Sequence, residues 1–114
     1  MHALIVDGAN VVGSRPDGWW HDRAGAALRL HQSLVGATLP HDEIVLVLEG
    51  AARRGVPAGQ QGRVLTVHAR HSGDDAIVDE TRTRSRGGWD VTVVTADRGL
   101  RARVEAEGEV VAPG

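Results

Sequence analysis

The chain has 114 residues, a formal net charge of -2, no cysteine and no lysine, so all thirteen basic residues are arginine. This length suits a single domain, residues 1–114, that hides roughly two thirds of its unfolded surface. The lack of cysteine excludes disulfides, thiolate metal sites and cysteine nucleophiles, and the charge balance argues against a generally basic nucleic-acid-binding surface. No apolar run approaches the ~20 residues of a membrane span, and no signal-peptide pattern opens the chain, so we expect a cytoplasmic protein.

Strand-like and helix-like patterns alternate along the first half of the chain. Residues 3–6 form a short apolar run that predicts a buried strand, and residues 44–48 form a second. Between them, apolar residues recur with helical spacing and predict one buried helix face ending at Gly36. The members of that face are Trp20, Ala24, Ala27, Leu28, His31, Leu34 and Val35. Residues 50–62 are rich in glycine and predict a loop with at most one helical turn.

The second half continues the alternation. Strands are predicted at residues 64–68 and 91–95, and a short edge strand at 109–112. Helices are predicted at residues 74–85 and 98–106, each followed by glycine. This order of elements implies a parallel sheet with helices on both faces, in one α/β domain.

Acidic residues follow three of the predicted strands. Asp7 follows the first, the pair Asp74-Asp75 follows the third, and Asp97 follows the fourth. Parallel strands end at the same edge of a sheet, which is where ligands bind in such folds. Carboxylates gathered there repel one another unless a cation neutralises them. The pattern therefore predicts a divalent metal site, and oxygen ligands favour Mg²⁺ or Mn²⁺.

Each acidic position also has a structural alternative. Asp7 could close the strand end in an Asx turn, and Asp97 could cap the last helix. Ser72 with Asp75 resembles a capping box. Asn10 suits either a helix cap or a hydrogen bond to a metal-binding acid. The metal site is preferred because three separate strand ends bring carboxylates to one edge.

The surroundings of this edge are basic and contain a pair of tryptophans. The basic residues that could hold phosphates there are Arg53, Arg54, Arg70 and His71. Trp19-Trp20 is expected to anchor the first helix, with stacking on a base as the alternative. The six histidines lack metal-ligand spacing and are expected at the surface or as caps.

Three motifs together resemble the NYN family of PIN-like ribonucleases, specifically its small YacP-like branch. They are Val-Asp-Gly-Ala-Asn-Val-Val-Gly at 6–13, Ser-Gly-Asp-Asp-Ala-Ile at 72–77 and Val-Val-Thr-Ala-Asp-Arg at 93–98. The segment Gly-Trp-Trp-His-Asp-Arg at 18–23 looks like a local mark of the same branch. The resemblance covers nearly the whole chain and implies a PIN-like three-layer αβα sandwich with about five parallel strands in the order 3-2-1-4-5.

The resemblance also implies a function, namely metal-dependent endonucleolytic cleavage of RNA. Its catalytic residues would be Asp7, Asn10, Asp74, Asp75 and Asp97. The four aspartates among them would bind Mg²⁺ or Mn²⁺, and Thr95 and Glu49 would lie just outside the metal ligands. Related sequences often have Asp where this chain has Glu49.

In this chemistry the metal activates a water molecule, so no protein nucleophile is required. A non-catalytic module that binds RNA or a protein partner is the alternative, and its sign would be a missing core acid. None of the core acids is missing. RNA is the expected partner, without a membrane, and a homodimer is compatible with the sequence.

Overall fold

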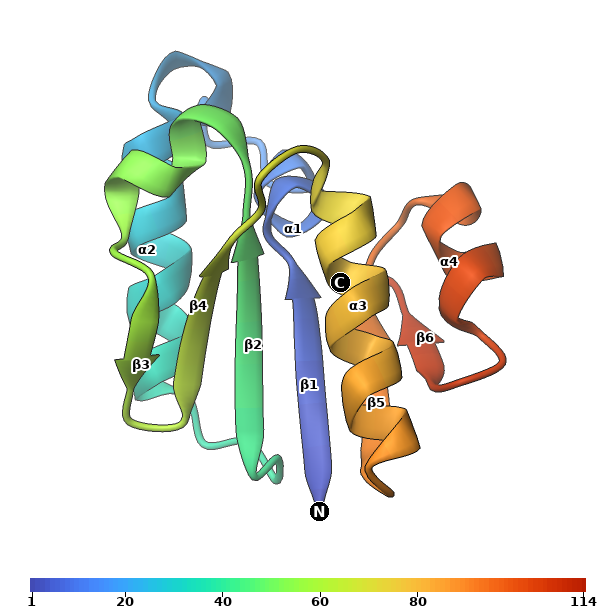
Figure 1. Cartoon of the computed structure of the whole chain (residues 1–114). Helices are drawn as coiled ribbons and strands as arrows, with labels where there is room; N and C mark the ends of the chain where they lie inside the picture. The colour runs from blue at the N-terminus through green and yellow to red at the C-terminus, as the bar shows by residue number, and fades with distance from the viewer.

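The computed structural model describes residues 1–114 and shows one six-stranded sheet between two layers of helices (Figure 1). The strands are β1 (His2–Asp7), β2 (Glu43–Leu48), β3 (Gly59–Gln61), β4 (Val64–His68), β5 (Asp90–Val94) and β6 (Glu109–Val111). The helices are α1 (Gly8–Gly13), α2 (Arg23–Gly36), α3 (Gly73–Arg86) and α4 (Arg98–Val104), with 3-10 turns η1 (Trp19–His21) and η2 (Gly50–Gly55). No helix has the length and apolar character needed to cross a membrane.

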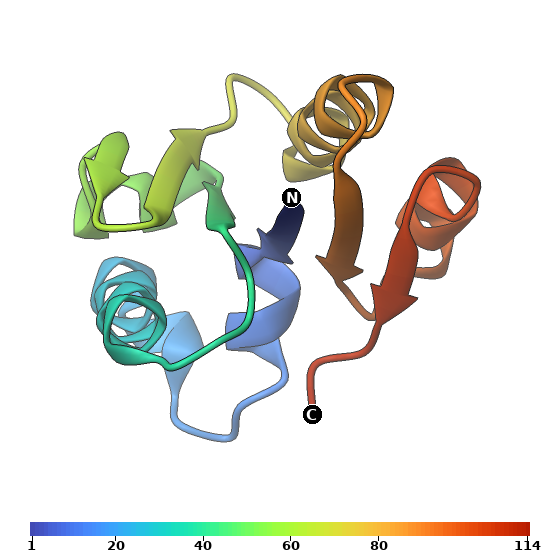
Figure 2. The same cartoon turned by 90° about the horizontal axis from the view of Figure 1, so that it is seen from below.

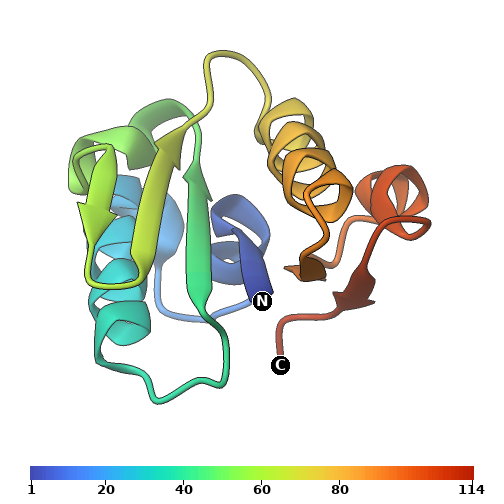
Figure 3. The same cartoon turned by 60° about the horizontal axis from the view of Figure 1, so that its bottom comes forward.

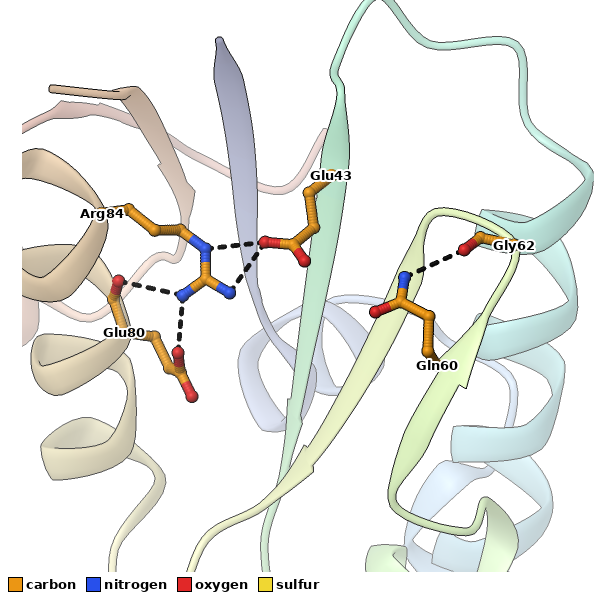
Figure 4. Close-up of polar contacts among 5 residues, drawn as sticks. All are labelled: Glu43, Gln60, Gly62, Glu80 and Arg84. Carbon is orange, nitrogen blue, oxygen red and sulfur yellow. Dashed lines mark hydrogen bonds and ion pairs between the residues drawn. The ribbon is translucent and has the colours of Figure 1, made fainter. Parts of the chain in front are cut away.

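The sheet has the order β3-β4-β2-β1-β5-β6. Its five parallel strands lie in the predicted order, so the predicted fold class is confirmed. The prediction of a loop at residues 50–62 was wrong, because this segment contains η2 and the antiparallel edge strand β3. Gly62 has a φ of 59°, which lets the chain reverse tightly into β4. Figure 3 shows the turn that joins β3 to β4. The Gln60 side-chain amide donates to the Gly62 carbonyl at 2.9 Å across this turn (Figure 4).

The core has two halves, one on each face of the sheet. Successive strand residues point to opposite faces, so Leu4 and Val6 of β1 face α1 and α2, while Ile5 faces α3 and α4. Figure 2 shows the two pairs of helices on opposite sides of the sheet. This alternation decides which polar residues meet at the ends of the strands.

Helix α2 begins later than its apolar pattern predicted. Asp22 caps it by accepting the Gly25 N–H at 2.8 Å, and a capping side chain marks the first turn of a helix. Trp20 therefore lies in η1, where its side chain is 55% exposed. Leu28 and Val35 are exposed as well.

The buried face of α2 is narrower than predicted. It is formed by Ala26, Ala27, Leu30 and His31. His31 is only 6% exposed, which agrees with its place in the predicted buried face and contradicts the general expectation that the histidines lie at the surface or act as caps.

Candidate functional site

The polar residues at the strand ends continue one face of the sheet. Asp7 follows Ile5 by two positions in β1, Glu49 follows Val47 just past β2, and Thr95 follows Val93 just past β5. Ile5, Val47 and Val93 all belong to the half of the core that packs against α3 and α4. A period of two therefore brings these polar side chains to the same face at the same edge.

Asp7 is only 4% exposed and accepts three hydrogen bonds. Its Oδ2 accepts the Thr95 hydroxyl and the Asn10 side-chain amide, both at 2.8 Å. Its Oδ1 accepts the Asn10 backbone N–H at 3.3 Å and thereby caps α1, a helix that the sequence did not predict. All three partners donate, which suits a carboxylate that acts only as an acceptor.

Glycine at position 8 allows α1 to start directly at the end of β1. A Cβ on Gly8 would lie 2.6 Å from the Val47 carbonyl oxygen and 2.9 Å from a Leu48 methyl group. Any larger residue would push α1 away from β2 and displace the cap at Asp7.

Two further carboxylates also accept N–H groups at helix starts, which have no partner within the helix. Glu49 Oε2 accepts the N–H of Gly73, the first residue of α3, at 2.8 Å. Asp97 Oδ1 accepts the Leu100 N–H at 3.0 Å and caps α4, while its own N–H donates to Thr95 Oγ1 at 3.1 Å. The capping roles considered for Asp7 and Asp97 are therefore present, and they coexist with the gathering of acids.

Asp74 differs from these three acids because nothing in the protein bonds to its carboxylate. It lies in the first turn of α3, three and four positions before Ile77 and Val78, which are buried against the sheet. Burial raises the pKa of Asp74, and repulsion from the carboxylates of Asp97, Asp7 and Glu49 raises it further, against a smaller lowering by Arg103. We call the four carboxylates of Asp7, Glu49, Asp74 and Asp97 the acidic edge.

Asp75 lies outside the acidic edge. Its Oδ1 forms an ion pair with Arg103 of α4 at 2.9 Å, and its side chain is 67% exposed. Its N–H donates to the Ser72 hydroxyl at 3.3 Å, so Ser72 caps α3. The structure therefore separates the two adjacent aspartates. Asp74 faces the other acids, while Asp75 faces Arg103.

The chemistry of the acidic edge fits a hard divalent cation, because all of its donors are carboxylate oxygens. The uncompensated repulsion on Asp74 points the same way. However, no group of three or more His, Cys, Asp or Glu side chains is arranged to hold a metal ion by itself. This combination suits Mg²⁺, which commonly takes one or two carboxylates from a protein and completes its shell with water and phosphate.

The expected basic residues lie around this edge and are exposed. Arg53 and Arg54 are in η2, and Arg70 and His71 are in the loop before α3, at the edge toward which the parallel strands point (Figure 1). The Arg53 Nε donates to the Gly50 carbonyl at 3.1 Å.

A cavity of about 300 Å³ lies beside the acidic edge, between α1, η1, the start of α2 and η2. Its lining residues are Gly8, Ala9, Val12, Trp19, Arg23, Leu48, Glu49, Gly50, Ala52 and His71. Arg23 belongs to the segment at 18–23 that resembles the YacP-like branch, but no sequence pattern assigned it a role at a cavity, and nothing marked Arg103, because both act through contacts between elements. The only available signal for the cavity was the Trp19-Trp20 pair.

No model of a protein family matches this chain, and no curated protein matches it in sequence. Among solved structures, the crystal structure of a mutant of Rae1 (YacP) from Bacillus subtilis matches with a TM-score of 0.63 and 17% sequence identity. The match covers 99% of this chain and 70% of Rae1. The chain therefore has the PIN-like fold that its YacP-like motifs implied.

Proposed function

We propose that the protein is a divalent-metal-dependent endoribonuclease that hydrolyses RNA phosphodiester bonds at the acidic edge. The observation that carries this proposal is the raised pKa of Asp74, caused by burial and by the carboxylates of Asp97, Asp7 and Glu49. A cluster of carboxylates with a perturbed acid at the ligand-binding edge of an α/β sheet is typical of a functional site. The fold of Rae1 (YacP) and the YacP-like motifs support the ribonuclease class.

The residues of the acidic edge have different roles in this proposal. Asp7 is held rigidly by Asn10 and Thr95, and Thr95 also links it to Asp97. Asp74 keeps both carboxylate oxygens available for a cation. Bound Mg²⁺ or Mn²⁺ would supply a Lewis acid that activates water and neutralises the phosphate charge.

The substrate is positioned from outside the acidic edge. Arg53, Arg54, Arg70 and His71 would contact the RNA backbone on either side of the reacting phosphate. Such contacts provide affinity without reading the base sequence.

A non-catalytic RNA-binding module is the second candidate, and one observation favours it. The acidic side chains include no group of three arranged to hold a metal ion. In that case the fold would bind RNA through its exposed arginines and cleave nothing.

The test is incubation of the protein with a mixed RNA pool in Mn²⁺, Mg²⁺ or EDTA, with Asp74→Asn and Asp79→Asn as a matched pair. Both changes remove one carboxylate from α3, but Asp79 is exposed and lies five positions further along the helix. We expect metal-dependent cleavage that falls at least ~100-fold in Asp74→Asn, because several kcal/mol of charge stabilisation are lost. Asp79→Asn should cleave normally.

Two other results would reject the nuclease. Binding without cleavage in every metal would favour the non-catalytic module, and no binding even at low salt would exclude both candidates.

Asp74→Asn is a cleaner variant than Asp7→Asn. An amide at position 7 would turn an NH₂ group toward a donor, and an unsatisfied buried group costs about 1–3 kcal/mol.

A further inference from the structure

The cavity beside the acidic edge differs from that edge in chemistry. Its walls are largely aliphatic, with Val12, Leu48 and Ala52 among them, and its polar groups are few. Sites for small organic groups have this composition, with apolar walls and a few placed polar atoms, and about 300 Å³ is at the lower end of their volumes. Arg23 and His71 add two basic side chains to the lining, but the aliphatic walls offer nothing to a hydrated phosphate or metal ion.

Three side chains with planar groups that can stack on a base line the cavity, namely Trp19, Arg23 and His71. The Arg23 guanidinium lies over the Trp19 ring, with its Cζ 5.4 Å from the ring centroid. Trp20 stands edge-on to Trp19, with centroids 6.1 Å apart and planes at 88°, but it does not line the cavity. Indole rings and guanidinium planes are the groups on which proteins stack unpaired bases.

The cavity and the acidic edge share one residue and adjoin at another. Glu49 lines the cavity, and only its Oε2 is bonded within the protein, to the Gly73 N–H. Its Oε1 is therefore free to accept a hydrogen bond from a ligand. Gly8, the neighbour of Asp7, also lines the cavity. A group in the cavity would thus lie next to a phosphate held at the acidic edge.

We propose that this cavity binds one unstacked nucleobase of single-stranded RNA, from a nucleotide next to the phosphate at the acidic edge. The choice of RNA as the polymer rests on the proposed function. Trp19 and Arg23 provide the stacking surfaces, the aliphatic walls exclude water, and the free Glu49 oxygen accepts from a base N–H. The site therefore selects unpaired segments, because a base inside a duplex cannot enter it.

The first test observes Trp19 directly. In a Trp20→Phe/Trp89→Phe protein, Trp19 is the only tryptophan, so its fluorescence reports on the cavity alone. We expect quenching by a single-stranded RNA pentamer and none by a ribose-phosphate pentamer without bases. Equal quenching by both chains would overturn the proposal, and equal affinity for a mononucleotide would reassign the cavity to a free nucleotide.

The second test compares Trp19→Ala with Trp20→Ala, which removes a neighbouring tryptophan of the same turn. Binding of the pentamer is measured by fluorescence anisotropy on the Asp74→Asn background in Mg²⁺. Trp19→Ala should weaken binding about 5- to 150-fold, the range that corresponds to the stacking of one base. Trp19→Phe should retain most of the affinity, and Trp20→Ala should change it less than twofold. Equal losses in both alanine variants would contradict a base site at Trp19.

The two proposals fail in different ways. If RNA is cleaved but normal and base-free pentamers quench Trp19 equally, the base-binding cavity is rejected and the nuclease proposal stands. If quenching depends on the bases but no RNA is cleaved, the nuclease proposal is rejected and the base-binding cavity stands. If Trp19→Ala fails to fold, the quenching experiment decides, because it leaves Trp19 in place.

Discussion

Charged residues gather where the parallel strands begin and again where they end, and the two groups are built differently. At the edge where β2 begins, Arg84 of α3 lies between Glu43 and Glu80 (Figure 4). Its Nε and Nη2 both reach Glu43 Oε1 at 2.8 Å, and its Nη1 reaches Glu80 Oε2 at 2.6 Å. The Arg84 side chain is 12% exposed, so this cluster is largely shielded from water.

At the opposite edge, the four carboxylates of the acidic edge form no ion pair, and Arg103 offsets only part of the repulsion on Asp74. Burial acts to lower the pKa of Arg84, but hydrogen bonds and attraction from Glu80 and Glu43 outweigh it and raise the pKa. For Asp74, burial and the neighbouring charges act in the same direction, against the ionised form. One chain therefore compensates its charges at one edge and leaves them uncompensated at the other. The first cluster is therefore arranged for stability, and in the proposed function the second cluster binds the metal ion.

Breaking the compensated cluster should have the largest effect on stability. Arg84→Met leaves Glu43 and Glu80 partly buried without a cation. Broken buried pairs typically cost ~3–5 kcal/mol. Because these carboxylates keep some contact with water, we expect the free energy of unfolding to fall by about 2–4 kcal/mol. Chemical denaturation measures this loss. Adding Glu43→Gln and Glu80→Gln should restore most of it, and a triple variant as unstable as the single one would contradict the charge argument.

Thr95→Val should affect activity more than stability. The variant keeps the shape of the side chain but removes the hydroxyl that bonds Asp7 and accepts the Asp97 N–H. Loss of a group that orients metal-binding residues typically lowers activity about 10- to 100-fold, and we expect that range for RNA cleavage. Thr95→Ser should retain activity, as should Thr92→Val in the same strand. A normal rate in Thr95→Val would leave the hydroxyl with a structural role only.

Asp74→Asn should stabilise the metal-free protein at neutral pH. Because the pKa of Asp74 is raised above its ordinary 3.8, the folded chain binds more protons than the unfolded chain between the two values. Stability therefore falls as the pH rises through that interval and stays lower above it. We expect the Tm of Asp74→Asn in EDTA to exceed wild type by a few degrees at pH 7, where ~1 kcal/mol corresponds to about 4–8 °C.

This gain should disappear below about pH 4, where Asp74 is protonated in both states of the wild-type protein. Mn²⁺ should raise the Tm of wild type more than that of Asp74→Asn. A lower Tm for the variant at pH 7 would show that Asp74 is stabilising and would end the contrast between the two clusters.

The smallest expected effect concerns the exposed arginines of η2, which have no carboxylate partner. Arg53→Ala/Arg54→Ala should weaken RNA binding to a similar degree for different sequences. Each lost phosphate contact should reduce the slope of log affinity against log salt by about 0.7 for single-stranded RNA. A salt series on the Asp74→Asn background measures this slope, and an unchanged slope would remove η2 from the binding surface.

The strands and their order could be predicted from the sequence because each apolar run is short and bounded by turn residues. Strand β4 has the predicted residues 64–68, and the other predicted strands differ by one residue at one end or at both ends. The start of α2 could not be predicted from apolar spacing. The spacing included Trp20, but Asp22 caps the helix, so α2 begins only after that residue. Strand β3 has no apolar residue, so no periodicity reveals it.

The gathering of acids was predictable from the strand ends, but their individual partners were not. Period-two alternation places Asp7 and Glu49 on one face, and helical spacing places Asp74, rather than Asp75, above Ile77 and Val78. The Asp75–Arg103 ion pair depends on how α4 packs against α3. The cavity at Trp19 depends on four elements meeting, and no local pattern encodes that meeting.

The two edge strands limit how copies of this chain can associate. Each is only three residues long, and β3 carries Gly-Gln-Gln with all three residues exposed. Such short edges offer few free backbone groups to a strand of another molecule, which discourages open-ended pairing between sheets. A homodimer of this protein would therefore be built through side chains of its helices and loops, and fibril-like growth through the sheet is disfavoured from both sides.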